Sequence, residues 1–165
     1  MPPTSFSVSS KGNDMTSQEP RHTTFVFERI CAAPIDRVFA AFADPKERER
    51  WGAPSETAAF IYDKVDFREG GIDVFRCGDK NNPQYRGVTT YYDIVRNERI
   101  ISSEVVETQG KKLLVTMATT TFERQGTGTK VIVTAQLTSL AGDDMLNGAK
   151  FGHNASLDNL VNAMQ

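Results

Sequence analysis

TKVIVTAQLTSLAGDDMLNGAKFGHNASLDNLVNAMQ, residues 129–165, changes its hydrophobic period at Gly142. Before that glycine, apolar and polar side chains alternate, and one face of the segment carries Val131, Val133, Ala135 and Leu137. A period of two is typical of a strand with one buried face. We therefore predict a strand over residues 129–137 and a different structure soon after it.

The residues after Gly142 repeat with the period of a helix. Asp143 and Asp144 suit a first helical turn, where the helix dipole favours negative charge. One stripe of the helix then carries Ala149, His153, Ser156, Leu157, Leu160 and Met164. At 1.5 Å per residue the helix would be about 33 Å long, which is enough to cross a whole curved sheet.

Two glycines, Gly148 and Gly152, lie one turn apart in this helix. Each costs about 1 kcal/mol relative to alanine in a helix interior, so both require a reason. A close approach to the sheet, a bend, or space for a bound molecule would each explain them. Alternatively, the helix begins later, near Phe151.

Residues 58–140 have the composition of strands and turns. Six strands are predicted there: AAFIYDKVDF (58–67), GIDVFRC (71–77), YRGVTTYYDIV (85–95), RIISSEVVE (99–107), KLLVTMATTTFE (112–123) and TKVIVTAQL (129–137). The segments between them are rich in turn residues. HTTFVFERICA (22–32) predicts one further strand ahead of the six. Because no helical pattern separates the six, we expect an antiparallel meander.

Two short helices are predicted between the first strand and the other six. The first begins at Pro34 and buries a stripe made of Ile35, Val38, Phe39 and Phe42. The second is capped by Asp44 and exposes KERER (46–50) to solvent. Trp51 anchors this second helix, and Gly52 ends it.

These elements define an α+β fold. A seven-stranded antiparallel sheet has one face to bury and only one long amphipathic helix to cover it, so the sheet must curl around that helix. We predict a helix-grip domain over residues 22–165, with the two short helices closing one end. Residues 1–21 are rich in Ser, Pro and Thr and lack the regions of a signal peptide, so we expect a disordered arm.

Composition argues against several classes of function. The 19 Lys and Arg residues are balanced by 21 Asp and Glu with no long basic block, which is not the pattern of a nucleic-acid-binding protein. No segment approaches the roughly 18 apolar residues of a membrane span. Cys31 and Cys77 do not suit a disulfide scaffold, and His22 and His153 do not give metal-ligand spacing. We expect a cytoplasmic monomer or homodimer without metal or cofactor.

The stretch FERICAAPIDRVFAAFADPKERERWGAP (27–54) resembles the start of the family of activators of the ninety-kilodalton heat-shock ATPase, within the START-like (SRPBCC, Bet v-like) helix-grip superfamily. REGGIDVF (68–75), YRGVTTYYDIVRNERI (85–100), FERQGTGTKVIVT (122–134) and GHNASLDNL (152–160) extend the resemblance over about residues 24–164. It implies a helix-grip fold with a cavity, and it suggests a chaperone as partner. Because His153 stands where the family often has Trp, the resemblance does not imply a particular ligand.

His153 and Glu104 are the polar residues best suited to contact a ligand. His153 lies on the inward stripe of the long helix, where it either bonds a ligand or is a core histidine held by a strand residue. Glu104 lies in a strand with apolar flanks, and a buried carboxyl there would suit binding or acid–base chemistry. A triad of Ser102, His153 and Asp66 has no supporting pattern, and we reject it.

Aromatic and partly polar strand faces supply the rest of the predicted lining. Half of each strand must point inward, and the expected ligand-binding set is Trp51, Tyr62, Phe75, Tyr92, Glu104, Met117, Thr119, Phe151 and His153. For the threonine-rich segment 116–121, one face is either exposed to solvent or lines a partly hydrated pocket, and we favour the exposed face. Alternation alone does not say which face of a strand is inside.

Three functions are compatible with these features. The first is a non-enzymatic domain that binds a small hydrophobic or amphipathic ligand in an internal cavity. The second is a protein-interaction module, by analogy with the co-chaperone. The third is an enzyme similar to helix-grip cyclases and hydrolases, with His153 or Glu104 in the reaction. We rank the enzyme below the other two and assign no catalytic residue.

Overall fold

The computed structural model describes residues 18–165. Its elements are β1 (Arg21–Cys31), α1 (Ile35–Ala43), α2 (Pro45–Gly52), β2 (Ala58–Lys64), β3 (Ile72–Asp79), β4 (Asn82–Val95), β5 (Arg99–Thr108), β6 (Lys111–Gln125), β7 (Gly128–Ser139) and α3 (Asp143–Ala163). The strands form a seven-stranded antiparallel sheet in the order β1-β7-β6-β5-β4-β3-β2. The α+β helix-grip prediction is confirmed. The predicted arm falls mainly on residues 1–17, which lie outside the described residues.

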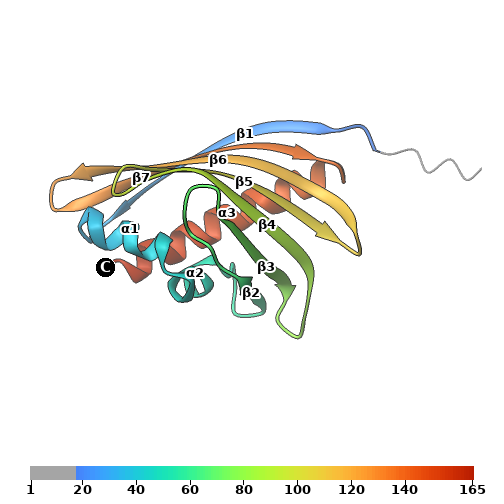
Figure 1. Cartoon of the computed structure of the whole chain (residues 1–165), viewed down its shortest axis with the longest axis horizontal. Coiled ribbons are helices and arrows are strands. Elements are labelled where there is room, and N and C mark those ends of the chain that lie inside the picture. The colour runs from blue at the N-terminus through green and yellow to red at the C-terminus, as the bar shows by residue number, and fades with distance from the viewer. Residues whose placement is uncertain (1–17) are drawn as a thin grey trace, which may run out of the picture.

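The sheet curves around α3, the long C-terminal helix (Figure 1). β1 and β2 form the two edges of the sheet, and β1 pairs with β7, the last strand of the chain. The close backbone contacts of α3 fall on β1, β7 and α2, whereas α1 packs against β6 and β7. α1 and α3 therefore cover the β1–β7–β6 side, and α2 packs against β2 at the opposite edge.

The start of α2 follows the predicted capping pattern. Asp44 accepts hydrogen bonds at Oδ1 from the backbone N–H groups of Lys46 (2.8 Å) and Glu47 (3.2 Å). At the other end, Trp51 donates its indole N–H to the carbonyl oxygen of Ala41 at 3.0 Å. This bond fixes α2 against α1.

α3 begins directly after Gly142. That glycine has a φ of 81°, a conformation that glycine adopts at little cost and other residues do not. The helix continues to Ala163, so Gly148 and Gly152 both lie inside it. The alternative in which the helix begins near Phe151 is therefore wrong.

The hydrophobic core is densest on the β1–β7–β6 side. The buried inward-facing residues there include Phe27, Cys31, Phe122, Val131, Val133, Ala135, Leu137, Leu157 and Leu160. The face predicted from residues 129–137 is thus the inner face of β7. Phe42 of α1 closes this region by packing edge-on against Phe122, with 5.1 Å between the ring centroids.

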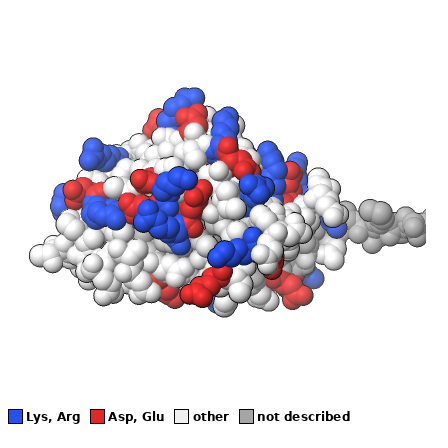
Figure 2. Space-filling view, turned by 90° about the horizontal axis from the view of Figure 1, so that it is seen from below, with Lys and Arg blue, Asp and Glu red and all other residues white. Residues whose placement is uncertain are grey.

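Charged side chains of both signs are interspersed on the face of the molecule shown in Figure 2. Several form exposed ion pairs, such as Arg76 with Asp63 at 2.9 Å and Arg86 with Glu107 at 3.2 Å. Pairs of this kind contribute little to stability because water screens them. Among the helices of residues 18–165, none is both long and apolar enough to cross a bilayer.

Candidate functional site

The registers of β3 to β6 place four polar side chains in one row. Asp73 on β3 is opposite Thr89 on β4. Thr89 is opposite Glu104 on β5, and Glu104 is opposite Thr116 on β6. Opposed residues share one face of a sheet, and the burial of Asp73 and Thr116 identifies this face as the inner one. Asp73 and Glu104 are two strand spacings apart, roughly 9–10 Å.

Aromatic side chains of β2 and β3 lie next to this row of polar residues. Phe75, Gly87 and Val106 form the adjacent inward row, and Phe75 is fully buried. The Phe75 ring lies over Gly87, because a Cβ on that glycine would be only 2.0 Å from Phe75 Cζ. Phe60 of β2 stacks on Phe75 with 4.5 Å between the ring centroids. The polar row therefore adjoins a surface suited to an apolar molecule.

Glu104 points to the inside of the sheet without a partner. Burial alone raises the pKa of its carboxyl from 4.5 to about 7, and no hydrogen bond or charged group within residues 18–165 contributes to that shift. The residue nevertheless retains accessible surface. Glu104 is therefore surrounded by protein on the concave face of the sheet and still reaches accessible space.

Arg48 of α2 reaches the same face of the sheet. Its Nη1 donates to Asp73 Oδ2 (2.6 Å), to the Tyr91 hydroxyl (2.7 Å) and to the Tyr62 hydroxyl (3.2 Å). The Tyr91 hydroxyl in turn donates to Asp73 Oδ2 at 2.6 Å. Asp73 Oδ1 accepts from the backbone N–H of Asp66 at 2.7 Å. The buried charge of Asp73 is thus fully compensated.

The guanidinium of Arg48 lies between aromatic rings. Its Cζ is 4.5 Å from the Tyr62 ring centroid and 5.6 Å from that of Phe67. Two of its nitrogens, Nε and Nη2, are buried without a hydrogen-bond partner among the described residues. Stacking on the two rings is the favourable interaction that remains for this edge of the side chain.

Two further titratable side chains respond electrostatically to Glu104. Burial raises the pKa of the Tyr62 hydroxyl, and the Glu104 carboxylate adds to that rise. Burial also raises the pKa of the Cys77 thiol to about 12, again with a contribution from Glu104. Both groups are therefore neutral near pH 7. A thiol with this pKa is not a reactive nucleophile.

His153 lies on the inner side of α3 and is held by the helix itself. Its Nδ1 is 2.8 Å from the carbonyl oxygen of Ala149, and its ring stacks on Phe27 with 5.3 Å between centroids. Burial lowers the pKa of the imidazole. A neutral ring with Nδ1–H as donor fits these contacts, which are those of a core histidine. Within residues 18–165 no group of His, Cys, Asp and Glu could hold a metal ion.

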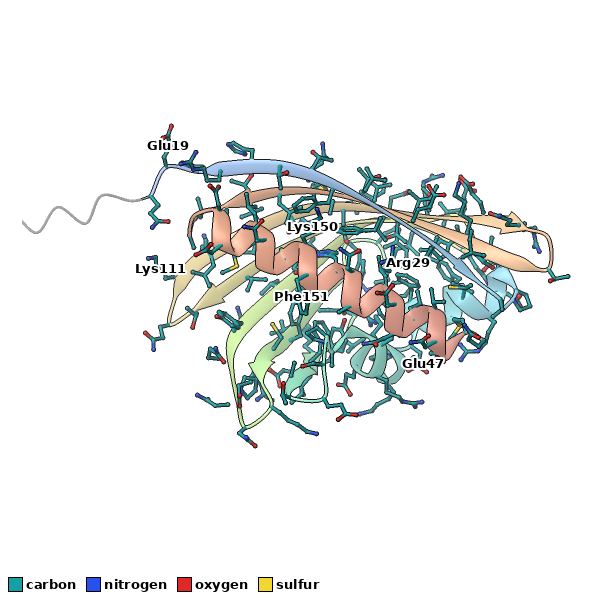
Figure 3. The ribbon with its side chains drawn as sticks, turned by 180° about the vertical axis from the view of Figure 1, so that it is seen from behind. Glu19, Arg29, Glu47, Lys111, Lys150 and Phe151 are labelled. Carbon is teal, nitrogen blue, oxygen red and sulfur yellow. The ribbon has the colours of Figure 1, made fainter. Side chains whose placement is uncertain are left out.

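Four predicted lining residues lie outside the interior. Tyr92 (54% exposed), Met117 (40% exposed) and Thr119 project from the convex face, because their neighbours Tyr91, Thr116 and Ala118 take the inner positions. Phe151 extends from α3 into solvent and is 71% exposed (Figure 3). The prediction that these four residues line the interior is wrong in this structure. For each of the three strand residues, an immediate neighbour in the sequence faces inward instead.

Trp51 is half-buried and belongs to a different surface. It lines an open groove of about 530 Å³ between α2 and the C-terminal end of α3, together with Arg37, Glu47, Arg50, Ala53, Ser55, Glu56, Asn159, Asn162 and Ala163. Ser156 donates to the carbonyl oxygen of Gly52 at 2.8 Å, and Asn159 donates to that of Ala53 at 2.9 Å. These bonds join the two helices beneath the groove. Tyr62, Phe75, Glu104 and His153 therefore remain as the predicted residues on the inner side.

Sequence reasoning missed Arg48, Asp73 and Tyr91. Arg48 was assigned to the solvent face of its helix, yet only 6% of its surface is exposed. Its position three residues before the anchor Trp51 places both on one side of α2, and this spacing could have revealed it. Asp73 is two residues from the apolar Phe75 in a short strand, so both side chains lie on the same face. This spacing could likewise have placed the carboxylate on a buried face.

Comparison with known proteins agrees with the fold. The model of the family described as Activator of Hsp90 ATPase homolog 1-like protein matches residues 32–165. A structure from Rhizobium leguminosarum is 31% identical and has a TM-score of 0.73, covering 86% of this chain and 93% of the other. One from Rhizobium loti is 31% identical with a TM-score of 0.75 over 87% of this chain and 97% of the other.

A structure from Chromobacterium violaceum, 23% identical, has a TM-score of 0.75 over 86% of this chain and 96% of the other, and it supports the fold alone. No curated protein matches the chain. The family model nevertheless covers every element after β1, including both short helices and α3. The chain therefore belongs to the Activator of Hsp90 ATPase homolog 1-like protein family, within the START-like helix-grip superfamily.

Proposed function

We propose that this protein binds a small apolar or amphipathic molecule in the interior between α3 and the inner faces of β2 to β5. The observation that carries the proposal is the unpartnered Glu104 carboxyl, which faces inward and keeps accessible surface. A carboxyl sealed in a solid core would be costly to bury. Room beside it for water or a guest molecule reduces that cost.

Other inward-facing residues of β2, β4 and β5 support the same reading. Phe60, Tyr62, Thr89, Ser102 and Val106 all belong to inward-facing rows, and each is only partly buried. Inward-facing residues of β7 are fully buried under α3. The difference favours an interior that is less completely filled beside β5 than beneath β7, whereas Asp73, Phe75 and Tyr91 on β3 and β4 are buried.

One of the two glycines of α3 adds a second line of support. A Cβ built on Gly148 or Gly152 would meet no described atom within 4 Å, apart from neighbouring parts of the helix itself. Neither glycine is therefore required by a close approach of α3 to the sheet. Gly148 is exposed, so the open space beside it is solvent; Gly152 is half-buried, and space for a bound molecule remains an explanation for that glycine alone.

Filling the interior tests the proposal. We would titrate the protein with an apolar fluorescent probe and a panel of lipids, and read binding from thermal shift and from amide resonances of β3 to β5. The Val106→Trp variant places a large ring in the interior and should abolish binding. Val26→Trp, on the convex face where Val26 is 64% exposed, is the matched control and should bind as the original does.

Two outcomes would contradict this proposal. Equal binding by the folded Val106→Trp and Val26→Trp variants would place the probe elsewhere. Absence of any shift in the inward-facing resonances would leave the protein without a binding interior. The thermal unfolding transition of each variant identifies those that are folded before binding is compared.

Family membership motivates a second candidate, contact with a heat-shock ATPase. The convex face offers exposed apolar side chains for such a contact, among them Val26, Ile30, Tyr92, Val115 and Met117. Exposed apolar residues on one face are typical of protein-interaction surfaces. A pull-down with the ATPase and a measurement of ATP hydrolysis test this candidate, with Val26→Asp and Met117→Asp as variants. Failure of the original protein to bind the ATPase or change its rate would reject it.

The cysteines support a reducing compartment such as the cytoplasm. Cys31 and Cys77 are both free thiols in the structure, one fully and one partly buried. Proteins of oxidising compartments more often use their cysteines in disulfides. Fractionation of cells that express the protein, followed by immunodetection, tests this location.

A further inference from the structure

We propose that the ligand carries a protonated amine, and that its ammonium group binds the carboxylate of Glu104. This inference rests on the proposed binding interior and specifies its chemistry. It narrows the expected ligand from any amphipathic molecule to a hydrophobic amine, with an apolar body and one positive charge.

The first argument is charge balance on the inner face. Arg48 and Asp73 neutralise each other in a buried ion pair with 2.6 Å between Nη1 and Oδ2. Thr89 separates Asp73 from Glu104, and Thr116 lies on the other side of Glu104. Both threonines are uncharged. The ionised Glu104 is thus the one negative charge in this row without a compensating group among the described residues.

The second argument is the cost of that charge. An unpaired carboxylate in a desolvated site is unfavourable, and an opposite charge placed beside it recovers much of the loss. A ligand ammonium donates up to three hydrogen bonds, which suits a carboxylate that accepts none from the protein. A ligand carboxylate would instead repel Glu104, so the same residue disfavours fatty acids.

The third argument concerns the body of the ligand. Phe60 and Phe75 form a stacked pair beside the polar row, and Val106 continues the apolar surface along β5. Aromatic rings also attract cations through their faces. A primary amine attached to an aromatic or alkyl group would place its charge at Glu104 and its apolar part against these side chains.

Three probes of nearly equal shape test the inference. We would measure the affinity of 2-phenylethylamine, 2-phenylethanol and 3-phenylpropionate for the full chain at pH 8 by calorimetry or by nuclear magnetic resonance titration. The amine should bind about tenfold or more tightly than the alcohol, since charge-assisted hydrogen bonds are roughly twice as strong as neutral ones. The propionate should bind most weakly.

The matched variants are Glu104→Gln and Glu107→Gln. Both change a glutamate of β5, but Glu107 pairs with Arg86 instead of facing the row around Glu104. Glu104→Gln should remove the preference for the amine and leave alcohol binding unchanged, whereas Glu107→Gln should behave as the original. Equal binding of amine and alcohol, or an amine preference that survives Glu104→Gln, would overturn the inference while the binding interior stands. If no probe binds at all, the proposed function fails with it.

The pH dependence provides a test that needs no variant. Amine affinity should rise between pH 6 and pH 8 as Glu104 loses its proton, and alcohol affinity should not. The other groups near this face do not confuse the result: Tyr62 and Cys77 are held neutral by their raised pKa values, and burial lowers the pKa of His153 on α3. Arg48 stays charged and paired with Asp73. A flat amine profile over this range would contradict the inference.

Discussion

The two sides of the concave sheet bury their side chains to different degrees. On the β1–β7–β6 side, α1 and α3 cover the sheet, and residues such as Val131, Leu137 and Leu160 are almost completely inaccessible. On β5, inward-facing residues such as Ser102 and Val106 stay partly accessible, whereas Asp73 and Phe75 of β3 and Tyr91 of β4 are buried. The single long helix α3 is too narrow to cover the whole concave face of a seven-stranded sheet. The fully buried side contributes most to stability, and in the proposed function the partly accessible face of β5 is where the ligand binds.

The polar groups follow the same division. The covered side contains His153, which is bonded to its own helix, and buried hydroxyl groups such as those of Thr129 and Ser139, which donate to backbone carbonyl oxygens. The other side contains an ion pair, two tyrosine hydroxyls and an unpartnered carboxyl. Buried polar groups that serve only stability are usually satisfied, so an unpartnered one is a marker of function. In the proposed function, the ligand therefore binds on the side that carries Glu104.

The largest expected effect comes from breaking the buried ion pair. Arg48→Met leaves Asp73 without its cationic partner in a desolvated site, which should cost about 3–5 kcal/mol of unfolding free energy. Urea unfolding measures this loss. Arg76→Met is the control, because the pair of Arg76 with Asp63 is exposed, and it should leave the unfolding midpoint unchanged. Similar losses of unfolding free energy in both variants would show that the buried Arg48 network stabilises the fold no more than the exposed pair of Arg76 and Asp63 does.

The next effect compares packing on the two sides. Leu160 has no accessible surface, and Leu160→Ala should destabilise the protein by about 3 kcal/mol through lost burial and a new cavity. Val106→Ala removes apolar surface that already borders accessible space, so its cost should be about 1 kcal/mol or less. Chemical denaturation of both variants gives the difference. A cost for Val106→Ala as large as that for Leu160→Ala would mean that the two sides are packed equally well.

The third effect depends on pH. Because the pKa of Glu104 is raised from 4.5 in the unfolded chain to about 7 in the fold, stability should fall as pH rises through this interval. Glu104→Gln removes the dependence, so the variant should match the original near pH 4 and exceed it by at most about 3 kcal/mol at pH 8. Urea unfolding across this range measures both curves. Parallel curves would show that Glu104 is solvated normally.

The fold was largely predictable from periodicity. Alternation in residues 129–137 and the helical stripe from Ala149 to Met164 describe a strand and a long helix, and seven strands with one such helix leave little choice of architecture. The cap at Asp44 was predictable for the same reason, since it depends on residues three positions apart. Sequence patterns were sufficient to predict those elements whose interactions join residues close together in the chain.

The site was predictable only in part. Glu104 and Tyr62 were correctly selected for an inner face, but Tyr92 and Met117 were placed there as well and lie outside. Alternation divides a strand into two faces and does not identify the buried one, which is decided by the curvature of the whole sheet. The partners of Arg48 lie on β2, β3 and β4. The sequence of α2 can therefore indicate that Arg48 is buried, but it does not indicate which residues Arg48 bonds.

The smallest effect concerns the glycines of α3 and separates their two remaining explanations. Because added methyl groups at Gly148 and Gly152 meet only open space, alanine at each should stabilise the helix by about 1 kcal/mol, as thermal unfolding would show. Gly87→Ala is the contrasting control and should destabilise, since its Cβ would collide with the Phe75 ring. Stabilisation with unchanged probe binding would mean that the two glycines only lower the stability of α3. Stabilisation with weaker binding would mean that they keep space open for the ligand.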